Sequence, residues 1–268
     1  MIKKTINIVW LKRDIRSQDH DPLLHAERSG LPYIIIYMFE PTLINYPDTS
    51  IRHLQFIYHS ILNLNNTLSK YNKAVSVFYA EAVDVLEHIH NNYNIQTIYS
   101  YQESGTLLSW KRDKAVKRFT KFNNIAWVEF QRDGILRGIK NRNAWNSKWH
   151  KAMHKPVIKN SYTKGNYIPI EHHFNLPEKL KNRLENYPKH FQPAGETNAW
   201  RYISSFTQKR GFNYQKHISK PVESRMGCSR LSPYLAWGNI SIKQAFQYIG
   251  THPNGTKNSR AFSAMLTR

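Results

Sequence analysis

Short apolar runs alternate with stretches of helical period along the first 130 positions of the chain. The runs are rich in β-branched residues and occupy 6–11, 32–39, 74–80, 95–101 and 125–130. Continuous apolar runs of this length are typical of strands that are covered on both faces of a sheet. The stretches between them are helical, and in one of them a single face carries Leu54, Ile57, Ile61, Leu64 and Leu68. This order predicts an α/β domain over 1–130, with a doubly wound parallel sheet and right-handed crossovers.

The pattern changes after residue 130. Residues 131–195 mix Asn, Lys, His and Pro with short helical pieces that carry Trp, and we interpret them as an interdomain connector. From residue 196 every periodic stretch is helical, with Trp200, Ile203 and either Phe206 or Thr207 along one face. We therefore expect a second, all-α domain over 196–268. Its last stretch, 259–268, has helical character and no stop signal, so we expect the chain to end partway through this domain.

The charge of the chain narrows the choice of partner. The formal net charge is +21 and the isoelectric point is about 10.0, values that favour a polyanion, with nucleic acid as the first candidate. An anionic membrane surface is the second candidate, but no apolar run approaches the roughly 20 residues of a membrane span. The first apolar run is shorter than a signal peptide's core, and the single Cys228 excludes an internal disulfide. We expect a cytoplasmic protein.

Residues 226–241 carry the most suggestive local pattern. Ser232 followed by Pro233 is a good beginning for a helix, and Ser241 is a good cap for the next one. Because the first amides of a helix lack intrahelical partners, two adjoining helix starts beside Cys228 and Ser229 would suit a phosphate group. Residues 224–268 contain no Asp or Glu, which also favours an anion site. Neither a G-x-G-x-x-G nor a Walker motif follows any strand candidate.

Other candidate chemistry is weaker. The first strand is followed by charged residues where a ligand crevice opens in such sheets, although a structural salt-bridge cluster is the simpler interpretation of Lys12, Arg13, Asp14 and Arg16. Only His150 and His154 have the spacing of a helical metal pair, and no H-E-x-x-H pattern is present, so we predict no metal site. No catalytic residue can be assigned, since no histidine can be paired with Cys228. Tyr214 lies in a turn between helices, where an aromatic ring could stack on a base or a flavin.

Several motifs then resemble the DNA photolyase and cryptochrome family, over the length of the chain. They are the opening VWLKRDIRSQDHDPL at 9–23, the second strand IIIYMFEP at 34–41, SYQESGTLLSWKRDKAV at 100–116, PAGETNAWRYISSF at 193–206 and CSRLSPYLAWGNIS at 228–241. The last is the most specific, because it is similar to the family's T-S-x-L-S-P-Y-L segment. The resemblance implies an α/β antenna-type domain followed by the beginning of a helical FAD-binding domain.

The resemblance also implies site residues. The family's segment at 228–232 cradles the phosphates of FAD, which makes the expected cofactor-binding residues Tyr214, Cys228, Ser229, Arg230, Leu231 and Ser232. Cys228 stands where the family has Thr. Ile218 stands where repair enzymes carry an Arg that reaches a DNA phosphate, and Leu108 and Ser109 replace the Asn-Glu pair of folate-binding members. The identity of an antenna chromophore therefore stays open.

The function that the resemblance implies is light-driven repair of DNA. In this family, reduced FAD passes an electron to a pyrimidine photoproduct that is flipped out of UV-damaged DNA. We expect this activity of a full-length form that acts as a monomer, with no membrane partner. Two alternatives remain: a cryptochrome-type photoreceptor without repair, and a truncated basic chain that binds nucleic acid without stable FAD.

Overall fold

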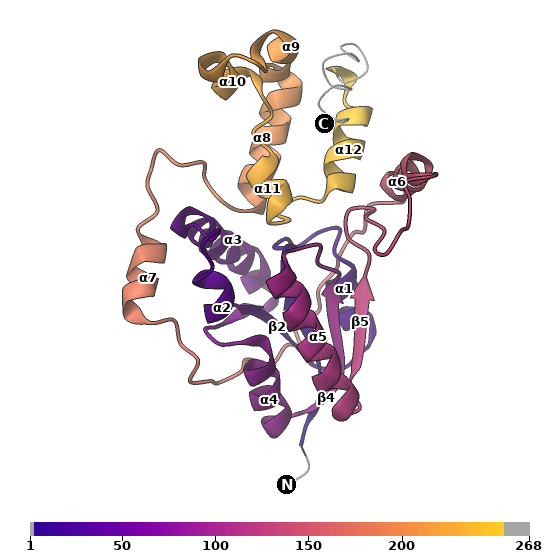
Figure 1. Ribbon diagram of the computed structural model, residues 1–268, viewed down its shortest axis with the longest axis vertical. Coiled ribbons are helices and arrows are strands. Elements are labelled where there is room, and N and C mark those ends of the chain that lie inside the picture. The colour runs from indigo at the N-terminus through magenta and orange to yellow at the C-terminus, as the bar shows by residue number, and fades with distance from the viewer. Residues whose placement is uncertain (1–2, 255–268) are drawn as a thin grey trace.

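A five-stranded parallel sheet forms the centre of the molecule (Figure 1). The computed structural model describes residues 3–254, so the helix expected at 259–268 lies outside the described residues. The strand order is β3-β2-β1-β4-β5. The strands are β1 (Thr5–Leu11), β2 (Tyr33–Met38), β3 (Val75–Phe78), β4 (Asn94–Tyr101) and β5 (Ala126–Phe130). Each strand lies within two residues of a predicted run, and the predicted doubly wound α/β fold is confirmed.

Helices cover both faces of this sheet, which is why its strands are apolar at successive positions. Neighbouring strand residues point to opposite faces, so Ile8 packs under α4 and α5 while Val9 packs under α1 and α3. The five apolar residues of the predicted helical face are all buried on α3, and they are Leu54, Ile57, Ile61, Leu64 and Leu68. The helices of this part are α1 (Asp21–Arg28), α2 (Pro41–Ile44), α3 (Ile51–Leu68), α4 (Ala82–Asn92) and α5 (Leu107–Phe122).

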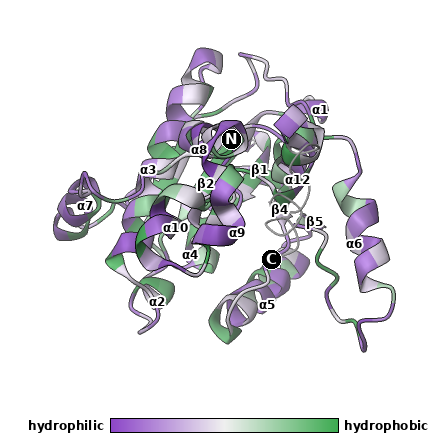
Figure 2. Cartoon of the chain, turned by 90° about the horizontal axis from the view of Figure 1, so that it is seen from above, coloured by the Kyte–Doolittle hydropathy of each residue, from purple (hydrophilic) through white to green (hydrophobic). Residues whose placement is uncertain are grey.

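The stretch 131–195 runs around the outside of the sheet domain and carries two helices, α6 (Trp145–Met153) and α7 (Glu178–Glu185). These helices lie on opposite sides of the molecule in both views (Figures 1 and 2). The stretch follows the sheet domain closely, since the amide of Tyr33 donates to the carbonyl of Asn166 and Leu184 of α7 is fully buried. It is thus a packed strap rather than a loose linker.

The last part of the described chain is helical and stands above the carboxyl ends of the strands (Figure 1). Ile203 and Phe206 are fully buried in its core, and Trp200 packs against it, along the face that the sequence predicts. No helix within residues 3–254 is long and apolar enough to cross a membrane. The helices are α8 (Glu196–Gln208), α9 (Tyr214–His217), α10 (Pro221–Gly227), α11 (Ser232–Ala236) and α12 (Ile242–Thr251).

The helical part meets the sheet domain through a direct backbone contact. The amide of Ile15 donates to the carbonyl of Trp237 (3.1 Å), and Arg16 Nη1 donates to the carbonyl of Gly238 (3.2 Å). Gly238 has φ +67°, and a Cβ there would lie 2.1 Å from the carbonyl oxygen of Arg13. Only glycine therefore permits this approach.

A buried carboxylate reinforces the same junction. Asp19 Oδ2 accepts a hydrogen bond from Ser241 Oγ (2.5 Å), and Asp19 Oδ1 lies 2.7 Å from Lys243 Nζ. Although burial alone would raise it, these contacts hold the pKa of Asp19 below its ordinary value. At the start of α8, Glu196 Oε2 accepts the amide and hydroxyl of Ser17 (2.7 and 2.8 Å). The loop that follows β1 is thus fixed by groups from α8 and α12.

We predict that Gly238→Ala lowers the free energy of unfolding by about 3 kcal/mol or more, because the methyl group adds a backbone clash to the cost of a left-handed conformation. Gly30→Ala is the matched control, since Gly30 has φ +69° with nothing within 4 Å of the added Cβ, and should cost about 1 kcal/mol. Urea unfolding of both variants gives the comparison. Equal losses for the two variants would contradict the contact.

Candidate functional site

A cavity of about 600 Å³ opens between α3, the end of the strap and the loop before α11, and we call it the 228–232 cavity. Helix α3 contributes Arg52, His53 and Phe56 from its first two turns. The cavity therefore depends on both parts of the chain. Its other lining residues are Tyr187, Phe191, Gln192, Tyr214, Ile218, Ser224, Cys228, Ser229, Arg230, Ser232, Pro233 and Trp237.

Most of the residues expected to bind a cofactor meet in this cavity. Its lining includes Tyr214, Cys228, Ser229, Arg230 and Ser232, although Tyr214 lies 14 residues before Cys228 in the chain. Tyr214 begins α9 and is buried in the helical core, rather than exposed in a turn as the sequence suggests, and Leu231 belongs to the same core but does not line the cavity. Its neighbours line the cavity while Leu231 anchors the loop. Contact of these residues with a cofactor stays a prediction.

Two side chains from distant segments hold the loop in shape. Arg210 Nη1 donates to the carbonyl of Cys228 (2.6 Å), and Arg210 Nη2 donates to that of Tyr202 (2.9 Å). Gln192 Nε2 donates to the carbonyl of Arg230 (2.5 Å), while Arg230 Nε donates to Gln192 Oε1 (3.2 Å). Arg230 itself has φ 62°, a left-handed conformation that these bonds maintain. Sequence reasoning missed Arg210 and Gln192, since neither belongs to a local motif.

The two helix starts differ from the arrangement that the sequence suggests. Ser232 is the first residue of α11 rather than its cap, and α11 is only five residues long, so its dipole is small. Ser241 does cap α12, in a capping box with Gln244, but its hydroxyl points to Asp19 and away from the cavity. The amide of Gln244 in the first turn of α12 is therefore already used by this cap. Any anion in the cavity would depend mainly on side chains.

Those side chains fit a nucleotide with a diphosphate. Arg52 and Arg230 bring guanidinium groups, and Ser229 and Ser232 bring hydroxyl groups, which together match the charge and acceptors of phosphates. The Arg52 guanidinium lies 4.5 Å from the ring centre of Phe191. The rings in the lining offer flat apolar surfaces for a base or a larger ring system, and they are Phe56, Tyr187, Phe191, Tyr214 and Trp237.

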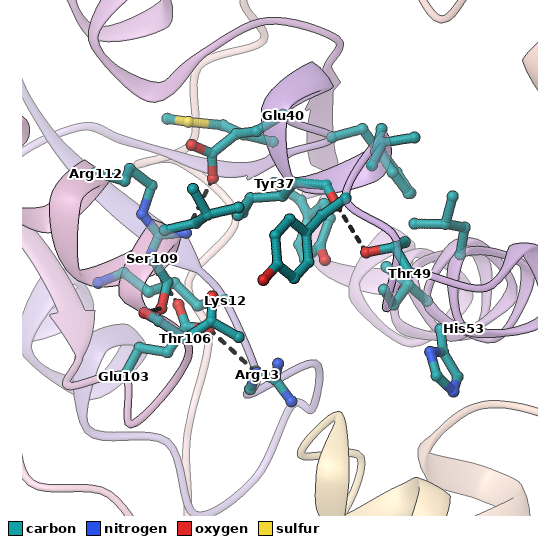
Figure 3. Close-up of a pocket in the computed structure, with 18 of the residues that line it drawn as sticks. Lys12, Arg13, Tyr37, Glu40, Thr49, His53, Glu103, Thr106, Ser109 and Arg112 are labelled. Carbon is teal, nitrogen blue, oxygen red and sulfur yellow. Dashed lines mark hydrogen bonds and ion pairs between the residues drawn. The ribbon is translucent and has the colours of Figure 1, made fainter.

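A second cavity of about 340 Å³ lies at the carboxyl ends of the strands, and we call it the strand-end pocket (Figure 3). Lys12 and Arg13 after β1, and Glu40 after β2, reach it, as the position of a ligand crevice in such sheets predicts. Asp14 and Arg16 do not line it. They are buried in structural contacts, with Asp14 Oδ2 2.8 Å from His20 Nε2, so both interpretations of the post-strand cluster hold in part.

Arg112 of α5 organises the polar side of this pocket. Its Nη1 lies 2.9 Å from Glu40 Oε1, and its Nη2 lies 2.6 Å from Glu103 Oε2. Burial would raise both carboxyl pKa values, but the nearby cations Arg112, Lys12 and Arg13 bring the pKa of Glu103 below its ordinary value. Burial of Glu40 prevails and raises its pKa to about 7. Glu40 Oε2 is buried and lacks a hydrogen-bond partner within the described residues.

The remaining lining of the strand-end pocket is largely apolar. Tyr37, Phe39 and Ile57 are among these residues, and Leu108 and Ser109 border the pocket from α5. A flat, largely apolar ligand with one polar edge near Glu40 would match this surface. Leu108 and Ser109 are the two positions at which the resemblance implied a departure from the folate-binding pattern, and both lie on this pocket.

Trp237 separates the two cavities. It lines both of them, as does His53, whose ring centre lies 6.2 Å from that of Trp237. The guanidinium of Arg13 lies 4.8 Å from the same indole ring. Trp237, which precedes Gly238 at the junction, thus lines both cavities.

Histidine pairs do not assemble into a larger group. His154 Nδ1 lies 2.7 Å from the carbonyl of His150, on the helix that carries both. In the part of the chain that the structure describes, no three His, Cys, Asp or Glu side chains are placed to hold a metal ion.

Comparison with known proteins places these features in context. The DNA photolyase family model matches residues 7–141. A deoxyribodipyrimidine photo-lyase of Alkalihalophilus pseudofirmus is 22% identical over 91% of this chain, and the chain spans 54% of that relative. The crystal structure of a Synechocystis cryptochrome superposes with TM-score 0.75 at 18% identity, over 100% of this chain and 60% of the other. An archaeal photolyase from Sulfolobus tokodaii, with two FAD molecules, gives 0.68 at 21%, over 97% and 59%.

We predict that Glu40→Gln becomes more stabilising, relative to the wild-type protein, as pH rises from 4 to 8. Folded Glu40 keeps its proton up to about pH 7, whereas the unfolded group loses it near 4.5. Since the folded state binds more protons in this window, wild-type stability falls by about 3 kcal/mol through this group, and the glutamine does not titrate. Chemical unfolding at several pH values measures the difference. Glu87→Gln, at an exposed site on α4, is the control, and identical pH profiles for wild type and Glu40→Gln would rule out the buried carboxyl.

Proposed function

The chain belongs to the DNA photolyase family, and from this premise we propose that it is part of a flavoprotein that uses light to repair pyrimidine photoproducts in DNA. The observation that carries the proposal is the donor set of the 228–232 cavity, in which two arginines and two serine hydroxyls face the same space as several aromatic rings. The chain spans about half the length of the photo-lyase that it matches, so activity of the whole protein is part of the proposal.

In this proposal the cavity holds FAD. When bound, FAD supplies the light-driven electron transfer that splits the photoproduct. Arg52 and Arg230 neutralise the diphosphate, and the hydroxyls of Ser229 and Ser232 donate hydrogen bonds to it. Arg210 and Gln192 keep the loop in its bound shape, which lowers the entropy lost on binding. Cys228 offers a weaker donor than the threonine of the family pattern.

The charge of the chain supports DNA as the partner. A net charge of +21 provides many phosphate contacts, which supply most of the affinity of nonspecific DNA binding. Ile218 lines the cavity where repair enzymes carry a phosphate-binding arginine, and Lys216 and Lys220 are exposed on either side of it. We infer that these lysines take over the missing contact.

The strand-end pocket is proposed to hold a second, light-absorbing ligand. Its aromatic lining suits a conjugated ring, and the buried carboxyl of Glu40 beside Arg112 suits a polar edge of that ring. The structure of the Sulfolobus tokodaii photolyase contains two FAD molecules, which supports the view that this fold accommodates two chromophores. Leu108 and Ser109, which replace the Asn-Glu pair of the folate-binding pattern, line this pocket and do not specify the chemical class of the second chromophore.

Two other functions compete with repair. A cryptochrome-type photoreceptor would use the same flavin cavity, and a cryptochrome is among the structural relatives. A basic chain that binds nucleic acid without stable FAD would need only the charge.

A repair assay separates these functions. We expect the whole protein of which this chain is part, carrying chemically reduced FAD, to restore oligonucleotides that contain a pyrimidine dimer under blue light and not in darkness. Bound flavin without restoration would favour the photoreceptor. Failure to retain any flavin, measured by visible absorbance after gel filtration, would favour the simple nucleic-acid binder.

We predict that Arg230→Gln weakens FAD binding on the order of 10-fold or more, because a charge-assisted hydrogen bond contributes about 1.5 to 3 kcal/mol. Arg225→Gln is the matched control, since Arg225 is exposed, lies five residues away and does not line the cavity. Quenching of flavin fluorescence on titration gives both dissociation constants. Equal values for the two variants would place the diphosphate elsewhere.

A further inference from the structure

The strap carries an unusual excess of positive charge. Residues 134–170 contain no Asp or Glu, while their basic residues are Arg137, Lys140, Arg142, Lys148, Lys151, Lys155, Lys159 and Lys164. This segment contributes none of the lining of the 228–232 cavity or of the strand-end pocket. Its charge therefore has no role in either of the two ligand sites.

These cations are displayed rather than neutralised. Among the described residues, the ion pairs of this segment involve only Arg137, 3.7 Å from Glu129. Lys148, Lys151 and Lys155 are exposed, and no ion pair reaches them within residues 3–254. By contrast, Lys243 of α12 forms an ion pair with the buried Asp19. Unpaired lysines at this density repel one another, which a polyanion would relieve.

Helix α6 holds its lysines in a fixed position. Its inner side packs on α12, where the rings of Trp149 and Phe246 meet edge to face with centres 5.6 Å apart. Met153 is 2% exposed, and Gln247 Nε2 donates to its carbonyl (2.7 Å). Lys148 is exposed on the outer side of the same helix. Preorganised charges lose less entropy on binding than charges on a mobile loop.

The packing of α6 favours binding of a nucleic-acid backbone over binding of a membrane surface. A helix that lies in a membrane needs a continuous free apolar face. On α6 the apolar residues Trp149 and Met153 are occupied by α12 and by Gly134, and Trp145 alone keeps a large exposed ring. Lys148 and Lys151, one turn apart on the helix, are exposed instead, and the exposed Lys155 follows two residues after the end of α6.

We propose that the outer face of α6, with Lys148 and Lys151, together with Lys155 just beyond the end of the helix, is a binding surface for the phosphate backbone of duplex DNA, separate from the flavin cavity. The inference rests on the proposed function only in taking DNA as the partner. The surface needs neither a photoproduct nor a flavin, because phosphate contacts are independent of sequence and of base damage. It would increase the residence of the protein on undamaged DNA.

The test measures binding of undamaged duplex DNA at several salt concentrations. Replacing Lys148, Lys151 and Lys155 with glutamine removes up to three phosphate contacts. The slope of log affinity against log salt should then become shallower by about 3, with affinity lower by at least about 10-fold at 0.1 M salt. The conservative variant with arginine at all three positions should bind like the wild type.

The matched control removes the same charge on the opposite side of the molecule, at Lys179, Lys181 and Arg183 of α7 (Figure 2). A loss confined to the α6 variant supports the proposal. Equal losses in both triple variants would mean that only the overall charge matters and would overturn it. So would an unchanged slope in the α6 variant, or loss of binding to anionic vesicles with DNA binding intact.

Flavin retention, measured in the same samples, keeps the two proposals apart. An α6 variant that retains flavin and also retains the wild-type salt slope rejects the α6 surface and leaves the proposed function standing. A wild-type chain that binds DNA with the expected slope but retains no flavin rejects the flavoprotein assignment and leaves the α6 surface standing. Retention of the wild-type melting temperature shows that the α6 variant is still folded.

Discussion

The close backbone contact at Gly238 is the constraint on which the rest of the structure depends. It brings the loop after β1 against the segment before α12. The contact therefore fixes the position of this loop relative to α12. Because Trp237 is the preceding residue, the same contact places its ring between the two cavities. A looser junction would alter the shape of both ligand surfaces at once, which explains why hydrogen bonds from Asn239 and Arg16 also converge there.

The distribution of acidic residues gives the surface its character. Asp19 and Glu196 serve the junction, and Glu40 and Glu103 share Arg112 in the strand-end pocket. Carboxylates placed inside in this way neutralise only a few buried cations. The outside is left more basic than an even distribution would make it, and α6 and its flanks carry the clearest example. The same placement of acidic residues therefore stabilises the junction inside the protein and leaves a basic surface that attracts polyanions.

Local patterns allowed the sheet and its helices to be predicted, because strand burial and helical faces are recorded within a few successive residues. Ser229 and Ser232 belong to one short motif and both line the 228–232 cavity, while their contact with a cofactor stays a prediction. Arg210 and Gln192 could not be found in this way, since they reach the 228–232 loop only after folding. The capping of α12 by Ser241 was predictable from the local pattern, whereas the hydrogen bond from the Ser241 hydroxyl to Asp19 joins residues 222 positions apart and was not.

Helix α3 links cofactor binding to folding of the sheet domain. Leu54 and Ile57 pack it on the sheet, while Arg52 and Phe56, on the same helix, reach the 228–232 cavity. A ligand that contacts this helix and the 228–232 loop together binds only when the junction is formed. Its binding free energy therefore adds to the stability of the junction, by an amount that grows with the logarithm of ligand concentration. The two parts of the chain are consequently stabilised as one unit by whatever occupies the space between them.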